Sequence, residues 1–383
     1  MKFTYFSRSF NNIYSGVEKK IASQVFSLKQ LGIDASILSL TDIHSAQIRS
    51  GDIHYIMMPV FSKSRIGFIR ILKQEHFIIL SLWQIICKMG SDDILYMRFN
   101  YPFFTWWYYL QKNRKCKVVF EHQDLESREY MMRGNYLYRV FDYIFGGSIR
   151  GHCDGIVGVT DEITLYEVKR SGDQKKPHVT IGNGINVDTV PMKNAFPFHG
   201  SPVHLLCVSN VSKWHGLDRL IRGMSTFSDR RKIHLHIVGS GEELPVIKKM
   251  VNDLSLNDAV FFYGPLHGKE LDELFNRCDI GVGTLGIHRK GLHEASTLKA
   301  REYCARGMPF IEGTSDLDFP PDFPYILHIP ADESPVDIPA VIRFTELIYA
   351  DLSFPVKMRE YARNSLDWSI KAVKLKGFLE SLV

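Results

Sequence analysis

Short apolar runs alternate with amphipathic segments along the chain, and the alternation occurs twice. A bounded apolar run is typical of a buried parallel strand, whereas apolar positions three and four apart are typical of a helix. The predicted strands are Lys2–Ser7, Ile33–Leu40, Val118–Glu121, Gly155–Val159 and Val179–Ile181, then His204–Ser209, His234–Gly239, Val260–Tyr263, Asp279–Leu285 and Met308–Ile311. The helices predicted between them include Val17–Leu31, Leu217–Met224, Leu244–Leu254, Glu270–Arg277 and Leu298–Arg306. The pattern predicts an α/β protein with two doubly wound parallel sheets.

A turn rich in glycine and asparagine, Gly182–Asn186, separates the two halves. Because two such sheets need separate cores, we predict a first domain at 1–186 and a second at 187–355 in the chain of 383 residues. A last helical segment, Val356–Phe378, predicts a C-terminal helix within 356–383 that crosses back to the first domain.

The stretch Asp279–Gly313 concentrates the polar chemistry of the second half. Ser296 or Thr297 can cap the predicted helix Leu298–Arg306, and Gly307 ends it. The N-terminus of this helix then points into the crevice where open α/β sheets bind ligands, and its amides favour an anion.

Two glutamates, Glu294 and Glu302, lie in this basic stretch with seven residues between them. Carboxylates in such a setting indicate a ligand with both anionic and hydroxyl groups. Alternatively, both glutamates could pair with neighbouring Arg and Lys side chains on a solvated helix.

Polar chemistry also follows the predicted strands of the first half. His122 comes directly after Val118–Glu121, at the edge where functional side chains of parallel sheets collect. Gly16 precedes the first predicted helix, where the backbone must approach a neighbour or ligand closely. Either residue alone could be structural.

The first half also carries the positive charge. The range Lys63–Arg150 holds 14 Lys and Arg against 8 Asp and Glu, and the whole chain has a net charge of +5. Within it, Ser64–Met89 is amphipathic and Asn100–Lys117 places aromatic residues beside basic ones, a combination typical of contact with anionic lipid. The rings could equally belong to a core. Nucleic acid is not expected, because no nucleic-acid module accompanies the charge.

The six cysteines form no CxxC pair and indicate reduced thiols. The N-terminus MKFTYFS is too short and polar for a signal peptide, and no run reaches the ~20 apolar residues of a membrane span. We expect a cytoplasmic protein, and leave open peripheral contact with the inner face of the plasma membrane.

Several short motifs follow one another in a fixed order. They are Asn183–Asn186, Ser209–Gly216 with Lys213, Ile237–Gly241, Phe262–Gly264, the pair Glu294 and Glu302 followed by Tyr303–Pro309, and Leu366–Trp368. In this order the chain resembles a family-4 retaining glycosyltransferase of the GT-B fold, of the bacterial surface-polysaccharide type. The resemblance implies two Rossmann-like domains that face each other across a cleft.

The resemblance also implies roles for individual residues. Glu302 would accept hydrogen bonds from the ribose hydroxyls, and Glu294 would lie near the hydroxyls of the donor sugar. Lys213 would stabilise charge on the leaving phosphate, and His122 would lie near the reacting centre. The further residues implied in donor binding are Gly16, Asn210, Gly264, Leu266, Ser296, Thr297 and Leu298.

The chain departs from the family pattern in the loops that would hold the phosphates. Ser209-Asn210 replaces a Gly-Arg pair, and Ala295–Thr297 replaces a glycine-containing run. The identity of a second phosphate-binding cation is therefore open. Arg289 is expected first, ahead of His215 and Lys290.

The expected activity is transfer of a sugar from a nucleotide-diphosphate sugar to a glycan or to a polyprenyl- or lipid-linked acceptor. No cofactor or metal is expected, although Asp316 and Asp318 could be read as the Asp-x-Asp of metal-dependent transferases. A nucleotide-sugar epimerase and a non-catalytic membrane-bound scaffold remain alternatives. A dinucleotide dehydrogenase is disfavoured because no strand leads into G-x-G-x-x-G. The nucleobase, sugar and acceptor stay open.

Overall fold

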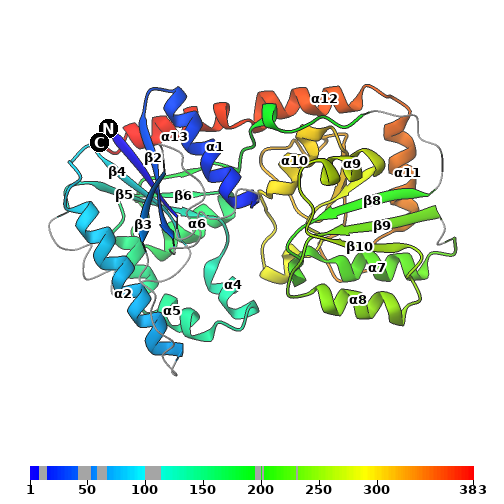
Figure 1. Cartoon of the computed structure of the whole chain (residues 1–383), viewed down its shortest axis with the longest axis horizontal. Helices are drawn as coiled ribbons and strands as arrows, with labels where there is room; N and C mark the ends of the chain where they lie inside the picture. Colours follow the sequence, from blue (N-terminus) through cyan, green and yellow to red (C-terminus); the bar gives the residue numbers. More distant parts are fainter. Residues whose placement is uncertain are drawn as a thin grey trace. The chain divides into compact units, whose positions relative to one another are not determined.

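The computed structural model describes residues 1–7, 15–41, 53–57, 67–99, 114–194, 200, 202–229 and 232–383. The chain divides into two compact units (Figure 1). The first unit comprises Met1–Gly182 and Trp368–Val383, and the second comprises Asn183–Asp367. The expected boundary at 186/187 lies four residues beyond the point where the units part.

The described part of the first unit contains a parallel sheet in the order β3-β2-β1-β4-β5-β6-β7. Its strands are β1 (Lys2–Ser7), β2 (Asp34–Thr41), β3 (Ile53–Met57), β4 (Ile94–Arg98), β5 (Lys117–His122), β6 (Gly155–Gly158) and β7 (His178–Thr180). Its helices are α1 (Gly16–Gln30), α2 (Gly67–Ile86), α4 (Glu126–Met132), α5 (Tyr136–Gly151), α6 (Asp161–Arg170) and α13 (Trp368–Glu380). The order reverses at β1, as in a doubly wound sheet. The sequence pattern had not predicted β3 or β4.

The C-terminal helix α13 covers one face of the first sheet together with α1. Ala372, Leu375 and Leu379 of α13 are fully buried in the same cluster as Ile21 and Leu28 of α1. Hydrophobic burial thus attaches the last residues of the chain to its first strands.

The opposite face is covered in part by α2, whose residues Ile78, Ile79, Leu82 and Ile86 are buried in the core. This part of the amphipathic segment Ser64–Met89 therefore belongs to the core of the first unit. The aromatic run at 101–109 lies outside the described residues. None of the helices that the structure describes is long and apolar enough to cross a membrane.

The second unit is built on a parallel sheet in the order β10-β9-β8-β11-β12-β13. Its strands are β8 (Val203–Val208), β9 (Ile233–Val238), β10 (Val260–Gly264), β11 (Ile280–Val282), β12 (Phe310–Glu312) and β13 (Ile326–His328). Its α-helices are α7 (Leu217–Thr226), α8 (Leu244–Asp253), α9 (Lys269–Arg277), α10 (Leu298–Arg306), α11 (Ile338–Tyr349) and α12 (Phe354–Tyr361). Helices α7 and α8 cover one face of the sheet, and α9 and α10 cover the other (Figure 1).

The position of α10 depends on Tyr303, which is fully buried against the sheet. Its hydroxyl lies 3.0 Å from the Leu206 carbonyl and 3.2 Å from the Val282 carbonyl. A Cβ at Gly281 would lie 2.7 Å from the Tyr303 ring, so only glycine leaves room for it. The helix that begins with Leu298 is therefore fixed on the strands beneath it.

The sequence predicted one continuous helix over Val356–Phe378. This prediction is wrong in one respect, because the helix is interrupted before α13. Helix α12 is followed by a π-helical turn, Ala362–Leu366, and Asp367 has extended backbone, φ −66° and ψ 143°. The carboxylate of Asp367 accepts a hydrogen bond of 3.0 Å from the Val187 amide. This tertiary contact overrides helix propensity where the chain leaves the second unit.

Two helical glycines allow a test of these close packings. In α7, a Cβ at Gly223 would lie 2.2 Å from the Val336 carbonyl oxygen, whereas a Cβ at Gly377 in α13 would meet nothing within 4 Å. We expect Gly223→Ala to lower the free energy of unfolding by about 1–3 kcal/mol. Gly377→Ala should raise it by about 0.5–1 kcal/mol through helix propensity. Urea unfolding followed by circular dichroism measures both, and equal effects would contradict the packing.

Candidate functional site

The loop after β8 carries Lys213 at the carboxyl edge of the second sheet. The short 3-10 helix Lys213–His215 is capped by Ser212, whose amide donates to His215 Nδ1 over 2.9 Å. Gly216 then takes a left-handed conformation, φ 65°, which glycine adopts without strain. The imidazole of His215 is therefore hydrogen-bonded within its own loop, whereas Lys213 is exposed.

The loop after β11 is hydrogen-bonded to the loop after β8. The amides of Leu285 and Gly286 donate to the carbonyls of His215 and Trp214, each over 3.1 Å. A Cβ at Gly216 would lie 2.8 Å from the Gly286 nitrogen, so glycine allows this close approach. The two loops therefore form one rigid edge.

Arg289, the expected second phosphate-binding cation, is already occupied. Its guanidinium donates to Asp218 and to Glu333 at 2.6–2.9 Å, and Nη1 also donates to the Lys213 carbonyl over 2.6 Å. These hydrogen bonds to Glu333 and Asp218 raise the pKa of Arg289 further above its usual range. In the structure Arg289 braces the backbone of Lys213, and a role toward phosphate would require it to release these partners.

Helix α10 begins where the sequence predicted. Thr297 is its N-cap, and Oγ1 accepts from the Ala300 amide over 3.3 Å. Leu298 is the first helical residue, so the unpaired amides of the first turn lie beside it. The Ser296 hydroxyl accepts from the Asn183 amide over 2.7 Å, which ties the start of the helix to the first residue of the second unit.

The two glutamates flank this helix start from different elements. Glu294 is half-buried in the preceding loop, where it pairs with Ser315 in an isolated bridge. Glu302 is on α10 itself, and its Oε1 accepts from Arg306 Nε over 3.0 Å. Arg306 also donates to Asp272 over 2.7 Å, so it does not depend on Glu302 alone.

The remaining expected donor-binding residues of the second unit lie at the carboxyl ends of β8 and β10, which flank β9 in the sheet. Asn210 is exposed after β8, and Gly264 closes β10 with φ 69° and accepts from the Gly239 amide over 2.8 Å. Leu266 follows it and packs against the core around α9 and α10. Parallel strands present their carboxyl ends at one edge, so these residues share the edge with Lys213 and the start of α10.

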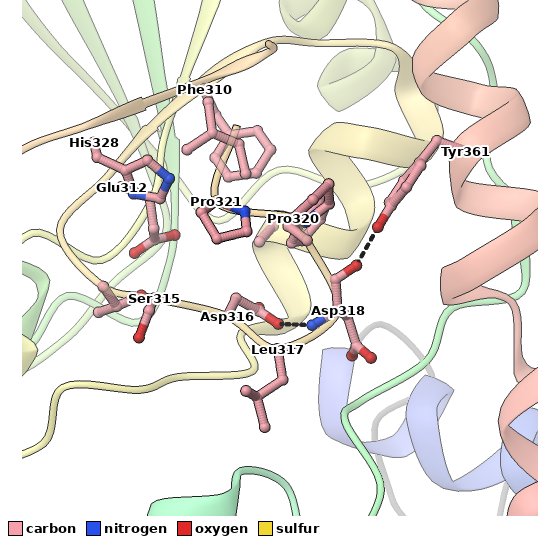
Figure 2. A pocket seen from close by; sticks show the side chains of 14 residues that line it. Phe310, Glu312, Ser315, Asp316, Leu317, Asp318, Pro320, Pro321, His328 and Tyr361 are labelled. Atoms are coloured by element: carbon pink, nitrogen blue, oxygen red, sulfur yellow. Dashed lines mark hydrogen bonds between the residues drawn. The ribbon is translucent and has the colours of Figure 1, made fainter. Parts of the chain in front are cut away.

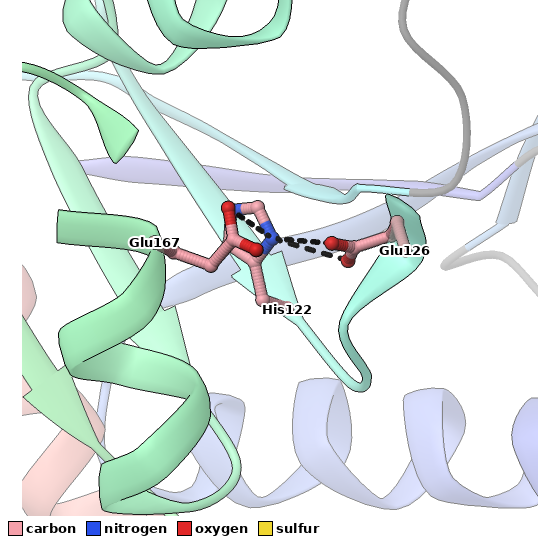
Figure 3. A group of neighbouring side chains, drawn as sticks. All are labelled: His122, Glu126 and Glu167. Carbon is pink, nitrogen blue, oxygen red and sulfur yellow. Dashed lines mark hydrogen bonds and ion pairs between the residues drawn. The ribbon is translucent and has the colours of Figure 1, made fainter. Parts of the chain in front are cut away.

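His122 and Gly16 belong to the first unit. Gly16 is the exposed first residue of α1. His122 ends β5 and is fully buried, and its ring stacks on Phe99 with the centroids 4.8 Å apart. Nδ1 lies 3.1 and 3.2 Å from the two carboxylate oxygens of Glu126 and 3.6 Å from Glu167 Oε2 (Figure 3). Among the described residues, Nε2 has no hydrogen-bond partner.

A buried guanidinium completes this cluster. Arg150 is fully buried, donates to Glu167 and to Asp142, and lies 3.5 Å from Glu126. Burial lowers the pKa of His122 to about 4 and raises the pKa of Glu126 to about 8. At neutral pH the imidazole is therefore neutral and Glu126 retains a proton. Sequence reasoning missed Glu126 and Arg150; the spacing of Glu126, four residues after His122, was the available signal.

Two sets of residues could be considered for a metal ion. Donor atoms of His122, Glu126 and Glu167 lie within 4.8 Å of one another, but Glu167 pairs with the Arg150 guanidinium and Glu126 retains a proton at neutral pH. Asp316 and Asp318, the candidate Asp-x-Asp, both pair with the buried Arg301. Both sets fit ion-pair networks better than metal sites.

Comparisons with known proteins bear on this geometry. Residues 192–318, which include Lys213, Glu294 and Glu302, match the family model described as Glycosyl transferases group 1. The chain is similar to sucrose-phosphate synthase from Thermosynechococcus elongatus, with a TM-score of 0.75, 15% identity, and coverage of 100% of this chain and 98% of that chain. The chain has the GT-B fold. This confirms the fold class expected from the sequence.

Two further solved structures share the fold over 100% of both chains. One is the lipopolysaccharide outer core galactosyltransferase WaaB, with a TM-score of 0.65 and 12% identity. The other is HepE from Anabaena in complex with UDP-glucose, with a TM-score of 0.67 and 12% identity. No curated protein sequence matches the chain.

The His122 cluster predicts a specific pH dependence of stability. The pKa of Glu126 is higher in the folded protein than in the unfolded chain, so its protonated form stabilises the folded state. This stabilisation is fully present below the unfolded pKa and is lost as pH rises through about 8. Glu126→Gln removes this titration and keeps an oxygen toward His122. From pH 6 to pH 8, the free energy of unfolding of the variant, relative to that of the wild type, should rise by about 1–2 kcal/mol. Urea unfolding at each pH measures it.

The matched control is Glu129→Gln, on the same helix, where Glu129 forms a surface pair with Arg133. Its difference from the wild type should stay constant over this range. Parallel pH profiles for Glu126→Gln and the wild type would contradict a protonated Glu126.

Proposed function

We propose that the protein is a retaining glycosyltransferase of the family-4 type. It moves a sugar from a nucleotide-diphosphate sugar to a hydroxyl of a glycan or lipid-linked acceptor in the synthesis of a bacterial surface polysaccharide. The observation that carries the proposal is the carboxyl edge of the second sheet, where the loop of Lys213 and the first turn of α10 lie within the matched segment and Glu302 follows on the same helix. The complex of HepE with UDP-glucose and the name of WaaB support a nucleotide-sugar donor and a surface glycan.

In the proposed reaction, the bond between the anomeric carbon and the diphosphate oxygen breaks. A bond to the acceptor oxygen forms on the same face of the sugar, and the acceptor proton passes to the leaving phosphate. Negative charge therefore builds on the diphosphate, so the chemistry needs fixed positive charge and amide donors at that position. Lys213 supplies an exposed ammonium, and the first turn of α10 supplies amides and the positive end of the helix dipole.

The other assignments follow from the chemistry of the donor. Glu302 would accept from the ribose diol, since a carboxylate has two acceptor oxygens, and Glu294 would bind hydroxyls of the sugar. Asn210, Gly264 and Leu266 would complete the nucleotide pocket. The reaction as proposed uses no metal and no cofactor, and His122 and Gly16 remain predictions for the reacting centre.

Two substitutions test the donor site. Lys213→Met keeps the aliphatic stem and removes the charge, and it should lower the rate of donor turnover by roughly 10²–10³-fold. Glu302→Ala should weaken binding of the nucleoside diphosphate by roughly tenfold or more, because it removes hydrogen bonds to a charged acceptor. A thermal-shift screen with UDP, GDP, ADP and CDP identifies the nucleotide, and calorimetry then measures the affinities.

The matched control is Lys249→Met, which removes an exposed charge from α8, where Lys249 pairs with Asp253. It should leave turnover and affinity unchanged. Wild-type nucleotide affinity in Glu302→Ala and wild-type turnover in Lys213→Met would refute the site. Proton NMR of the first product anomer tests retention, and conversion of the donor without an acceptor would favour the epimerase.

A separate surface of the first unit supports the proposal of peripheral membrane contact on the cytoplasmic side. Helix α5 turns its large apolar residues outward: Tyr143 is 85% exposed, Tyr136 65%, Ile144 58% and Val140 51%. Its buried positions are Asp142, Gly146, Ile149 and Arg150, so two of the four are charged.

Exposed arginines accompany this apolar face. Arg139 lies on α5, and Arg133 follows α4. Tyrosine rings and aliphatic side chains beside arginines match a lipid surface, where apolar groups enter the headgroup boundary and arginines meet anionic phosphates. We infer that α5 is the element that contacts the membrane.

The double variant Tyr143→Glu/Ile144→Glu tests this surface. Burial of each side chain in lipid contributes about 1.5–3 kcal/mol, so partition into vesicles of phosphatidylglycerol and phosphatidylcholine should fall at least tenfold. Sedimentation of the vesicles measures it. Leu347→Glu, at a position that is 72% exposed on α11, is the control and should bind as the wild type does. Undiminished binding of the double variant would remove α5 from the interface.

A further inference from the structure

The second unit contains a cavity of about 630 Å³ at the carboxyl ends of β12 and β13 (Figure 2). The loop 314–321 forms one wall, and Tyr361 at the end of α12 forms another. None of the residues expected to bind the donor lines it, although Ser315 of its wall pairs with Glu294 in an isolated bridge.

Most of the wall is apolar and consists of rings. Phe319 stacks on Tyr361 with the centroids 5.7 Å apart and meets Phe310 edge-on at 5.8 Å. Pro320 and Ile326 line the same space. The Tyr361 hydroxyl donates to the Asp318 carbonyl, which holds the loop against α12. These contacts preform the cavity, as is usual for small-molecule sites.

The polar groups of the wall are predominantly acidic. Asp316 and Asp318 share one cation, the fully buried Arg301. Glu312, which is 3% exposed, accepts from the Thr284 amide through Oε1 over 2.7 Å. Among the described residues, Glu312 Oε2 has no partner within 3.5 Å, and the buried Thr314 hydroxyl lies near enough to lower the pKa of Glu312. The wall therefore offers acceptor oxygens, and its three acidic side chains outnumber the two neighbouring cations, Arg301 and Lys299.

We propose that this cavity binds a small organic cation, a protonated amine on an apolar body. The rings would take the apolar body and attract the cation through their faces. The ammonium would donate to Glu312 Oε2 and the Thr314 hydroxyl, two buried acceptors of the wall. An anion such as a nucleotide would meet three acidic side chains, whose charge Arg301 and Lys299 offset only in part.

The state of Glu312 fits this assignment. Burial raises the pKa of its carboxyl to about 7, although Lys299 opposes the shift. The Lys299 ammonium donates to the Gly283 carbonyl over 2.7 Å, and its charge lowers the pKa of Glu312. A bound ammonium would favour the ionised carboxylate and gain the charge-assisted bond. The inference does not depend on the proposed transferase activity.

Calorimetric titration of the full chain tests the proposal with phenethylamine and hexylamine as probes. Phenylacetate and heptanoate, with similar bodies and the opposite charge, are the comparison. We expect saturable binding of at least one amine below about 10 mM and at least tenfold weaker binding of both acids. Binding of an acid as tightly as its amine, or no amine binding in this range, would overturn the proposal.

Two variants place the amine in the cavity. Glu312→Gln keeps a carbonyl for the Thr284 amide and removes the charge, and it should weaken amine binding about tenfold. Leu317→Lys adds a cation at a lining position that is 53% exposed, and it should weaken binding similarly without disturbing the core. Leu347→Lys is the surface control. Unchanged amine affinity in Leu317→Lys and Glu312→Gln would refute the site, whatever the variants do to nucleotide binding.

Discussion

The second unit depends on one buried guanidinium, that of Arg301. It is fully buried, and it donates to the Asn183 carbonyl over 2.8 Å and to the carboxylates of Asp316 and Asp318. One side chain of α10 thereby joins the first residue of the unit to the loop that walls the cavity. Removal of a buried partner of this kind costs about 3–5 kcal/mol, because the other charges remain unpaired. These contacts also fix the start of α10, where the donor phosphates are proposed to bind.

The first unit places ionic groups in its interior, and this explains its unusual surface. Helix α5 turns Asp142 and Arg150 inward, toward Glu167 and His122. Because Asp142 and Arg150 take part of the buried face of α5, beside Ile149, Tyr143 and its apolar neighbours are left outside. Burial of the same cluster lowers the pKa of His122 and keeps its imidazole neutral.

The alternation of apolar runs was sufficient to predict the fold class and most strands of the second unit. His204–Ser209 and β8 differ by one residue at each end, because a buried parallel strand is apolar along its length. Strands β3, β4 and β13 were missed, and the last helix was predicted without its break at Asp367. The capping of α10 by Thr297 is local and was predicted, whereas the partners of Arg289 lie 71 and 44 residues away and follow only from the tertiary structure.

Arg289 already donates to Asp218 and Glu333, so another cation must bind the diphosphate directly. His215 accepts from the Ser212 amide, and burial lowers its pKa, so it is uncharged at neutral pH. Lys290 is 3% exposed and lies over the Trp214 ring, 3.9 Å from its centroid. Lys213 alone of the four expected cations combines exposure with a backbone held by a neighbour, the Arg289 guanidinium. Arg289 would then contribute to phosphate binding indirectly, by fixing the position from which Lys213 acts.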